Sequence, residues 1–107
     1  MIGETVYSGY LDTQVSSRKI HYVFVQSRES PLTAPLTVWF NGGPGCSSLI
    51  GMLQEIGPYI VGNDYTQGDI LTRNENSWNK ASNLLFLESP AAVGFSTDKD
   101  MHYHWTD

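Results

Sequence analysis

Residues 36–56 read LTVWFNGGPGCSSLIGMLQEI, and this stretch decides the fold. Its first five residues, 36–40, form a short apolar run that is typical of an interior strand covered on both faces. Three glycines then stand within the four positions 42–45. Because glycine has no Cβ atom, the backbone can turn sharply there. The stretch therefore begins with a predicted strand and a tight glycine loop.

The second half of the same stretch predicts a helix. Its apolar residues recur at the spacing of one helical face: Leu49, Met52, Leu53 and Ile56. Ser47 or Ser48 can cap the start of this helix, and Gly57-Pro58 ends it. Strand, glycine loop and helix thus follow one another without a gap.

Upstream, residues 5–11 and 20–25 are rich in β-branched and aromatic side chains, which predicts two strands. The polar residues 12–19 between them are typical of a hairpin connection. Gly9 interrupts the first strand and indicates a β-bulge.

Downstream, residues 84–87 form a second short apolar run, which Glu88-Ser89-Pro90 ends. The polar stretch 61–80 predicts a long surface excursion with a short strand near 69–71, and the tail 97–107 shows no convincing periodicity. Two antiparallel strands followed by strand, glycine loop, helix and strand predict an α/β open sheet.

Composition narrows the function classes. The 107 residues allow at most one domain, and only 16% are charged against 40% apolar, which is typical of a piece of a larger domain. The net charge is -5 and the longest basic run is Arg18-Lys19, so no nucleic-acid partner is expected. No apolar run reaches membrane-spanning length, so no membrane is expected as a partner. The N-terminus has no signal-peptide pattern, so either the protein is cytosolic or a signal sequence has been lost from this chain.

A single cysteine, Cys46, leaves two interpretations open. In an intracellular protein it would be an inert core residue, and in a secreted protein it would lack its partner. His21, His102 and His104 do not combine with it in any zinc spacing, so no metal site and no cofactor are predicted.

The glycine loop can also carry chemistry. Its N–H groups can approach a ligand closely, and the helix N-terminus beyond it favours negative charge. These are the requirements for stabilising a tetrahedral oxyanion. The alternative is a tight turn that merely joins a strand to a helix.

Five ordered blocks extend the argument. The string Asn-Gly-Gly-Pro-Gly-Cys-Ser-Ser-Leu at 41–49 resembles the serine carboxypeptidase family of α/β-hydrolases. The remaining blocks also resemble that family, in the right order: Tyr-Ser-Gly-Tyr-Leu-Asp at 7–12, Glu-Ile-Gly-Pro at 55–58, Asn-Ser-Trp-Asn at 76–79, and Asn-Leu-Leu-Phe-Leu-Glu-Ser-Pro at 83–90 with Val-Gly-Phe-Ser at 93–96.

The resemblance implies a role for each matching position. Gly43 would donate a backbone N–H to the oxyanion, and Asn41, with Gly42 close by, would bind the terminal carboxylate of a peptide substrate. Glu55 would join that carboxylate network, which favours binding at acidic pH because two charged carboxylates repel. The alternatives are a solvated carboxylate for Glu55 and a bridge across the turn for Asn41.

The same resemblance implies further roles around the loop. Trp39 would pack beside the carboxylate pocket, although core packing alone would also explain it. Ile50 and Gln54 would face the pocket for the leaving residue. Cys46 would form a disulfide with a later cysteine, as suits a secretory-pathway, vacuolar or lysosomal protein.

The catalytic nucleophile is not expected in this chain. The family carries it in a Gly-x-Ser-x-Gly elbow, and no such elbow is present. Neither the loop serines nor Ser96 fits that role, and the histidines are interpreted as structural or solvated. We therefore expect residues 1–107 to be an inactive N-terminal fragment of one α/β-hydrolase domain. The alternatives to a carboxypeptidase are an acyltransferase of the same pattern and a non-catalytic chain that binds peptides.

Overall fold

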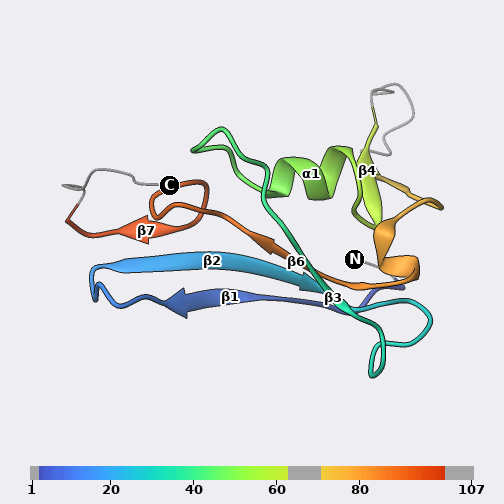
Figure 1. Cartoon of the computed structure of the whole chain (residues 1–107). Coiled ribbons are helices and arrows are strands. Elements are labelled where there is room, and N and C mark those ends of the chain that lie inside the picture. The colour runs from blue at the N-terminus through green and yellow to red at the C-terminus, as the bar shows by residue number, and fades with distance from the viewer. Residues whose placement is uncertain (1–2, 63–70, 101–107) are drawn as a thin grey trace.

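The computed structural model describes residues 3–62 and 71–100. Four strands form the main sheet in the order β1-β2-β6-β3: β1 (Val6–Asp12), β2 (Arg18–Val25), β6 (Asn83–Leu87) and β3 (Leu36–Trp39). A short strand, β7 (Thr97–Asp98), pairs with the start of β2. Figure 1 shows that the sheet lies along one side of the molecule and the α-helix of the described residues along the other.

The sheet is mixed, as the sequence predicts for an α/β fold. β1 and β2 form an antiparallel hairpin, and β3 runs parallel to β6. The predicted bulge at Gly9 is wrong, because the β1–β2 register runs without an insertion from Val6 opposite Val25 to Asp12 opposite Lys19. Gly9 instead makes room for the ring of its cross-strand partner Tyr22, whose nearest atom would lie 3.1 Å from an added Cβ.

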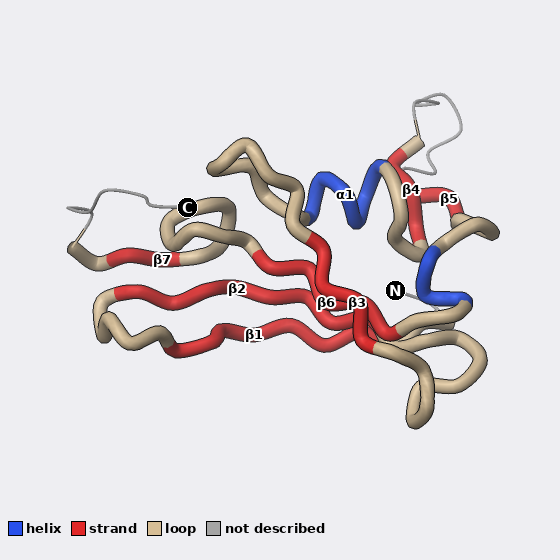
Figure 2. The backbone as a smooth tube through the Cα atoms, in the orientation of Figure 1, coloured by secondary structure: helices blue, strands red, loops and turns tan. Residues whose placement is uncertain are grey.

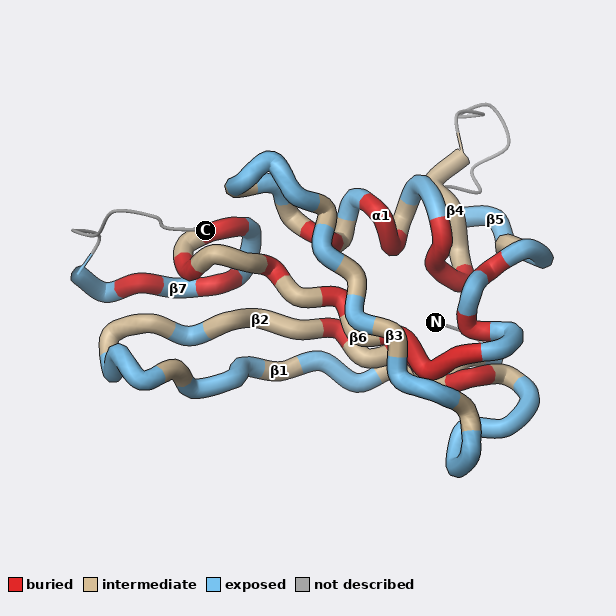
Figure 3. The backbone as a smooth tube through the Cα atoms, viewed as in Figure 1, coloured by how far each residue is buried: buried red, intermediate tan, exposed pale blue. Residues whose placement is uncertain are grey.

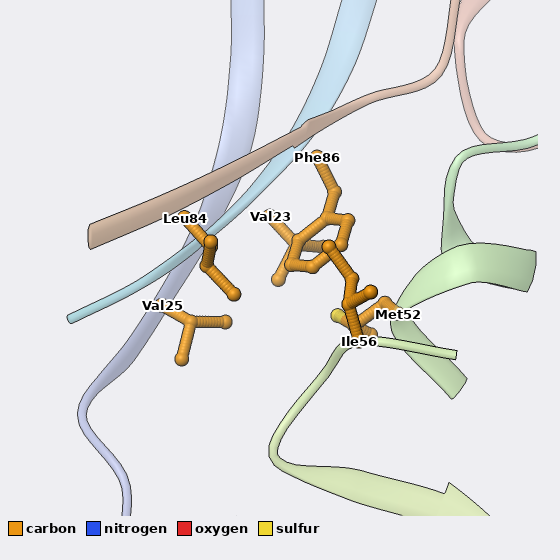
Figure 4. Close-up of a cluster of buried hydrophobic side chains, with 6 residues drawn as sticks. All are labelled: Val23, Val25, Met52, Ile56, Leu84 and Phe86. Atoms are coloured by element: carbon orange, nitrogen blue, oxygen red, sulfur yellow. The ribbon is translucent and has the colours of Figure 1, made fainter. Parts of the chain in front are cut away.

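One face of the sheet is covered by helix α1 (Leu49–Gln54), whose bounds confirm the predicted helix apart from its last turn. The buried core lies between the two: Val23, Val25, Leu84, Phe86, Met52 and Ile56. Figure 4 shows the four strand side chains of this cluster pointing toward Met52 and Ile56. Met52 comes from α1 itself and Ile56 from the turn that follows the helix.

The opposite face of the sheet has no covering layer among the described residues. Residues opposite one another in the register share a face, and on this face several large side chains are exposed: Tyr7, Leu11, Leu36 and Val38. The strand β1 is mostly exposed along its length (Figure 3). The molecule measures 43 × 39 × 21 Å, and the short dimension fits one sheet with one layer upon it.

The predicted excursion has more structure than the sequence suggests. Strands β4 (Tyr59–Val61) and β5 (Leu71–Arg73) form a small antiparallel sheet apart from the main one, and a 3₁₀ turn, η1 (Trp78–Lys80), follows (Figure 2). The predicted strand near 69–71 overlaps β5 at Leu71, and residues 69–70 lie outside the described ones. In the described part of the chain, the one α-helix is too short to cross a bilayer.

Candidate functional site

The glycine loop lies between the end of β3 and the start of α1. Gly42, Gly43 and Gly45 have φ angles of 82°, 125° and 100°, a region that L side chains rarely adopt. The N–H of Cys46 donates to the Gly42 carbonyl at 3.2 Å and closes the turn. No described residue accepts a hydrogen bond from the Gly43 N–H, and Gly43 itself is exposed. A backbone donor is therefore free at the outer side of the loop.

Trp39 and Asn41 are brought together at the start of this loop. The indole Nε1–H of Trp39 donates to the Asn41 Oδ1 at 3.3 Å. The Asn41 backbone N–H donates to the Ser48 hydroxyl at 3.2 Å, which ties the loop entry to the helix start. The Trp39 ring also meets Trp78 edge-on, with 5.7 Å between ring centroids. Asn41 is thus held by its neighbours at both its side chain and its backbone.

The predicted residues on the helix are accessible. Ile50 and Gln54 are exposed and one helical turn apart. Glu55 is the C-terminal cap residue of α1, and its backbone N–H donates to the Gly51 carbonyl. The Glu55 carboxylate is exposed and makes no hydrogen bond or ion pair to any described residue, so the structure does not join it to Asn41.

The helix start differs in detail from the prediction. Ser48 occupies the N-cap position, yet its hydroxyl does not cap the helix. The Ser47 hydroxyl instead accepts a hydrogen bond from the Leu49 N–H at 3.2 Å. Cys46 is exposed and carries a free thiol.

A buried carboxylate beneath the loop was not predicted. Glu88 directly follows β6, and its side chain is 1% exposed. It accepts hydrogen bonds from the Ser47 hydroxyl and from the Phe95 N–H, the latter at 2.8 Å. The His21 Nδ1 lies 2.8 Å from Glu88 Oε2, the same oxygen that accepts from Phe95, whereas Ser47 donates to Oε1. The sequence signals for this cluster are a carboxylate at the end of a buried apolar strand and the blocks 83–90 and 93–96 that resemble the family, and neither signal gives the contacts.

This trio of serine, glutamate and histidine is not a catalytic triad. In a triad the histidine stands between the serine and the acid, where it takes the hydroxyl proton. Here Glu88 stands between Ser47 and His21, so the histidine does not contact the hydroxyl. Ser96 is equally unsuited to attack, because it is buried and its hydroxyl donates to the Glu88 carbonyl at 2.5 Å.

A mixed sheet with a glycine loop and a helix after a parallel strand defines a protein of the α/β-hydrolase type. The structure is similar to that of Kex1(delta)p, a prohormone-processing carboxypeptidase from Saccharomyces cerevisiae, with a TM-score of 0.72 and 32% identity over 92% of this chain and 22% of that one. The family model for serine carboxypeptidase matches residues 2–107. The chain belongs to the serine carboxypeptidase family.

Curated relatives agree with this assignment. A serine carboxypeptidase of Caenorhabditis elegans, ctsa-3.1, is 50% identical over 86% of the chain and 16% of its own length. The lysosomal protective protein of Mus musculus is 46% identical over 94% and 20%. Serine carboxypeptidase-like 40 of Arabidopsis thaliana is 50% identical over 92% and 20%. The chain thus spans about a fifth of the length of the relatives that it matches.

Proposed function

We propose that the complete protein is a serine-type carboxypeptidase, of which residues 1–107 are the N-terminal part of a single α/β-hydrolase domain. The observation that carries the proposal is the free, exposed N–H of Gly43 in a loop that follows a sheet strand. Such a donor suits a tetrahedral oxyanion during acyl-enzyme hydrolysis. The nucleophile, base and orienting acid would lie in later residues.

We further propose that this loop reads the free C-terminus of a peptide. Asn41 is the polar residue at the loop entry, with Gly42 beside it, and Trp39 orients its amide through the indole N–H. The exposed Glu55 would join them once a substrate carboxylate is bound. Ile50 and Gln54, exposed one helical turn apart, would face the leaving residue.

The relatives' names support a location in the secretory pathway, since one of them is a lysosomal protein. In that setting the exposed Cys46 would pair with a later cysteine of the complete protein. Such a bond would fix the outer side of the glycine loop to a distant segment.

The test uses the full-length gene product and two matched peptides, one with a free C-terminus and one amidated. We expect release of C-terminal residues from the free acid, with activity falling as pH rises. Glu55→Gln should flatten that fall, because a glutamine cannot become charged beside the substrate carboxylate. A full-length product that binds both peptides without cleaving either would contradict the proposal and favour a non-catalytic binding protein. Transfer of the acyl group to an alcohol in preference to water would indicate an acyltransferase.

A further inference from the structure

Glu88 places a carboxyl group where an unpartnered polar group is costly. Its side chain is 1% exposed, and burying a carboxylate without compensating partners strongly destabilises a fold. The compensation is nearly complete, because Ser47, Phe95 and His21 all direct hydrogen-bonding groups at it. An ionised carboxylate only accepts hydrogen bonds, and two of these partners, a hydroxyl and a backbone N–H, donate to it.

The backbone of Glu88 is anchored as firmly as its side chain. Its N–H donates to the His21 carbonyl at 3.0 Å, and its carbonyl accepts from the Ser96 hydroxyl at 2.5 Å. Gly94 lies so close that an added Cβ would stand 2.5 Å from the Glu88 carboxyl carbon. The turn over 93–96 therefore closes tightly around the carboxylate and leaves it little freedom to move.

Of the Glu88 side-chain bonds, the one to Ser47 reaches the glycine loop. Ser47 stands at the junction of the loop and α1, and its hydroxyl simultaneously accepts from the Leu49 N–H at 3.2 Å. The bond from Ser47 to Glu88 therefore joins the loop to the rigid end of β6. The far side of the loop is held by a second serine, since the Asn41 N–H donates to the Ser48 hydroxyl.

We propose that Glu88 is a positioning residue for the oxyanion loop: through Ser47 it fixes where the Gly43 N–H points. This inference rests on the proposed function, because it assigns Gly43 as the oxyanion donor. Glu88 touches no substrate atom in this role. Its effect is on the geometry of the donor, and misplacing a catalytic group by about 1 Å can lower a rate about a hundredfold.

The decisive variant is Ser47→Ala in the full-length protein, with Ser96→Ala as its matched control. Both serines bond to Glu88, but only Ser47 belongs to the loop. We expect Ser47→Ala to lower kcat about ten- to a hundredfold for free-acid and amidated peptides alike, with KM changed less than about twofold. Ser96→Ala should lower the Tm while kcat stays within about twofold.

A second pair of variants separates geometry from charge. In Glu88→Gln, the amide oxygen can accept from Phe95 and His21 while the amide NH₂ donates to the Ser47 hydroxyl, so the link to the loop persists. Glu88→Gln should therefore keep kcat within about threefold of the wild type. Glu88→Ala removes the link and should match the loss in Ser47→Ala.

Amide hydrogen exchange gives a readout that needs no activity. Exchange of the Cys46 N–H, which closes the loop on the Gly42 carbonyl, should speed up in Ser47→Ala and not in Ser96→Ala. Equal losses of kcat in both serine variants, in proportion to Tm, would overturn the proposal, as would unchanged loop exchange in Ser47→Ala. If the wild-type protein cleaves no peptide, the proposed function fails, and exchange alone still decides whether Glu88 holds the loop.

Discussion

At the scale of single residues, Gly51 makes room for the Trp39 ring because glycine has no Cβ atom. A Cβ at Gly51 would overlap the indole nitrogen and lie 2.7 Å from Cε2. The ring therefore packs directly on the backbone of α1, and its Nε1–H points to Asn41. A glycine that weakens a helix by propensity is here required by close packing.

Gly51→Ala tests this packing. The variant should destabilise the complete protein by about 1–3 kcal/mol, because the ring must move out of a filled site. It should also lower kcat/KM for free-acid peptides through loss of the Trp39–Asn41 bond. The double variant Gly51→Ala/Trp39→Ala, which removes the whole ring and with it the overlapping atoms, should be more stable than the sum of the single changes predicts. Additive losses, measured by urea unfolding, would show that the two residues are not coupled.

Asn41→Ala addresses recognition directly. Loss of a hydrogen bond to a charged carboxylate costs about 1.5–3 kcal/mol. That corresponds to about a ten- to hundredfold fall in kcat/KM for a free-acid peptide. The amidated peptide serves as the control and should change little, since it has no carboxylate. Equal losses for both peptides would assign Asn41 to loop structure instead.

The sequence predicted the loop residues better than it predicted what supports them. The backbone conformation of consecutive residues such as Gly42 and Gly43 can be predicted from a short string, because the need for positive φ is local. Glu88 also stands in a string that resembles the family, at 83–90, but that string does not reveal its role, which comes from contacts with distant residues in β2 and in the loop. Its surroundings exist only in the folded sheet.

At the scale of elements, the 3₁₀ turn η1 joins the segment after α1 to the N-terminal segment of the chain through hydrogen bonds. Asn79 is fully buried, and its Nδ2 donates to the Glu4 carboxylate at 2.8 Å and to the Gln26 carbonyl at 3.1 Å. The Ser77 hydroxyl bonds both the Asn79 Oδ1 and the Ile56 carbonyl. Glu4 is also paired with Arg28 at 2.6 Å.

Asn79→Ala should therefore destabilise the complete protein by about 2–4 kcal/mol, because it leaves buried acceptors without their donor. The exposed Asn76→Ala, three residues earlier, is the matched control and should change the unfolding free energy by less than about 0.5 kcal/mol. Chemical denaturation of both variants checks this. Similar denaturation midpoints for the two variants would mean that the Asn79 hydrogen bonds do not contribute to the free energy of unfolding.

Elements with a strong local pattern were predicted, and elements defined by their partners were not. The hairpin of β1 and β2, the strands β3 and β6, and the helix α1 all follow from periodicity or apolar runs. β4 and β7 are strands of three and two residues, too short for any periodicity to show. The position of β6 between β2 and β3 also has no local signal, because it depends on pairing across the chain.

At the scale of the whole molecule, the uncovered sheet face is the dominant feature of the surface. Leu36 and Val38 on the edge strand β3 are 57% and 42% exposed on this face. Exposed apolar side chains next to an open strand edge favour association between copies. We propose that later residues of the complete protein cover this face.

The 107-residue chain alone should therefore self-associate with rising concentration and bind the dye ANS. Val38→Lys should reduce both effects, because a charge on an edge strand opposes pairing. Thr33→Lys adds the same charge in an exposed loop away from the sheet and serves as the control. Sedimentation that shows a monomer at all concentrations, without dye binding, would contradict the prediction.

The central position of β6 has a consequence for synthesis on the ribosome. The β1–β2 hairpin can form once Val25 has emerged, but the other edge of β2 and the whole of β3 have no partner until Asn83–Leu87 has been made. At about 5–20 residues per second, that interval lasts roughly 3–12 s. The free edge of β2 stays open throughout this interval, and β3 adds further open edges once Trp39 has been made. The synthesis of residues 26–87 is thus a stage at which neighbouring chains on one messenger RNA can pair with each other, and at which a chaperone would protect them.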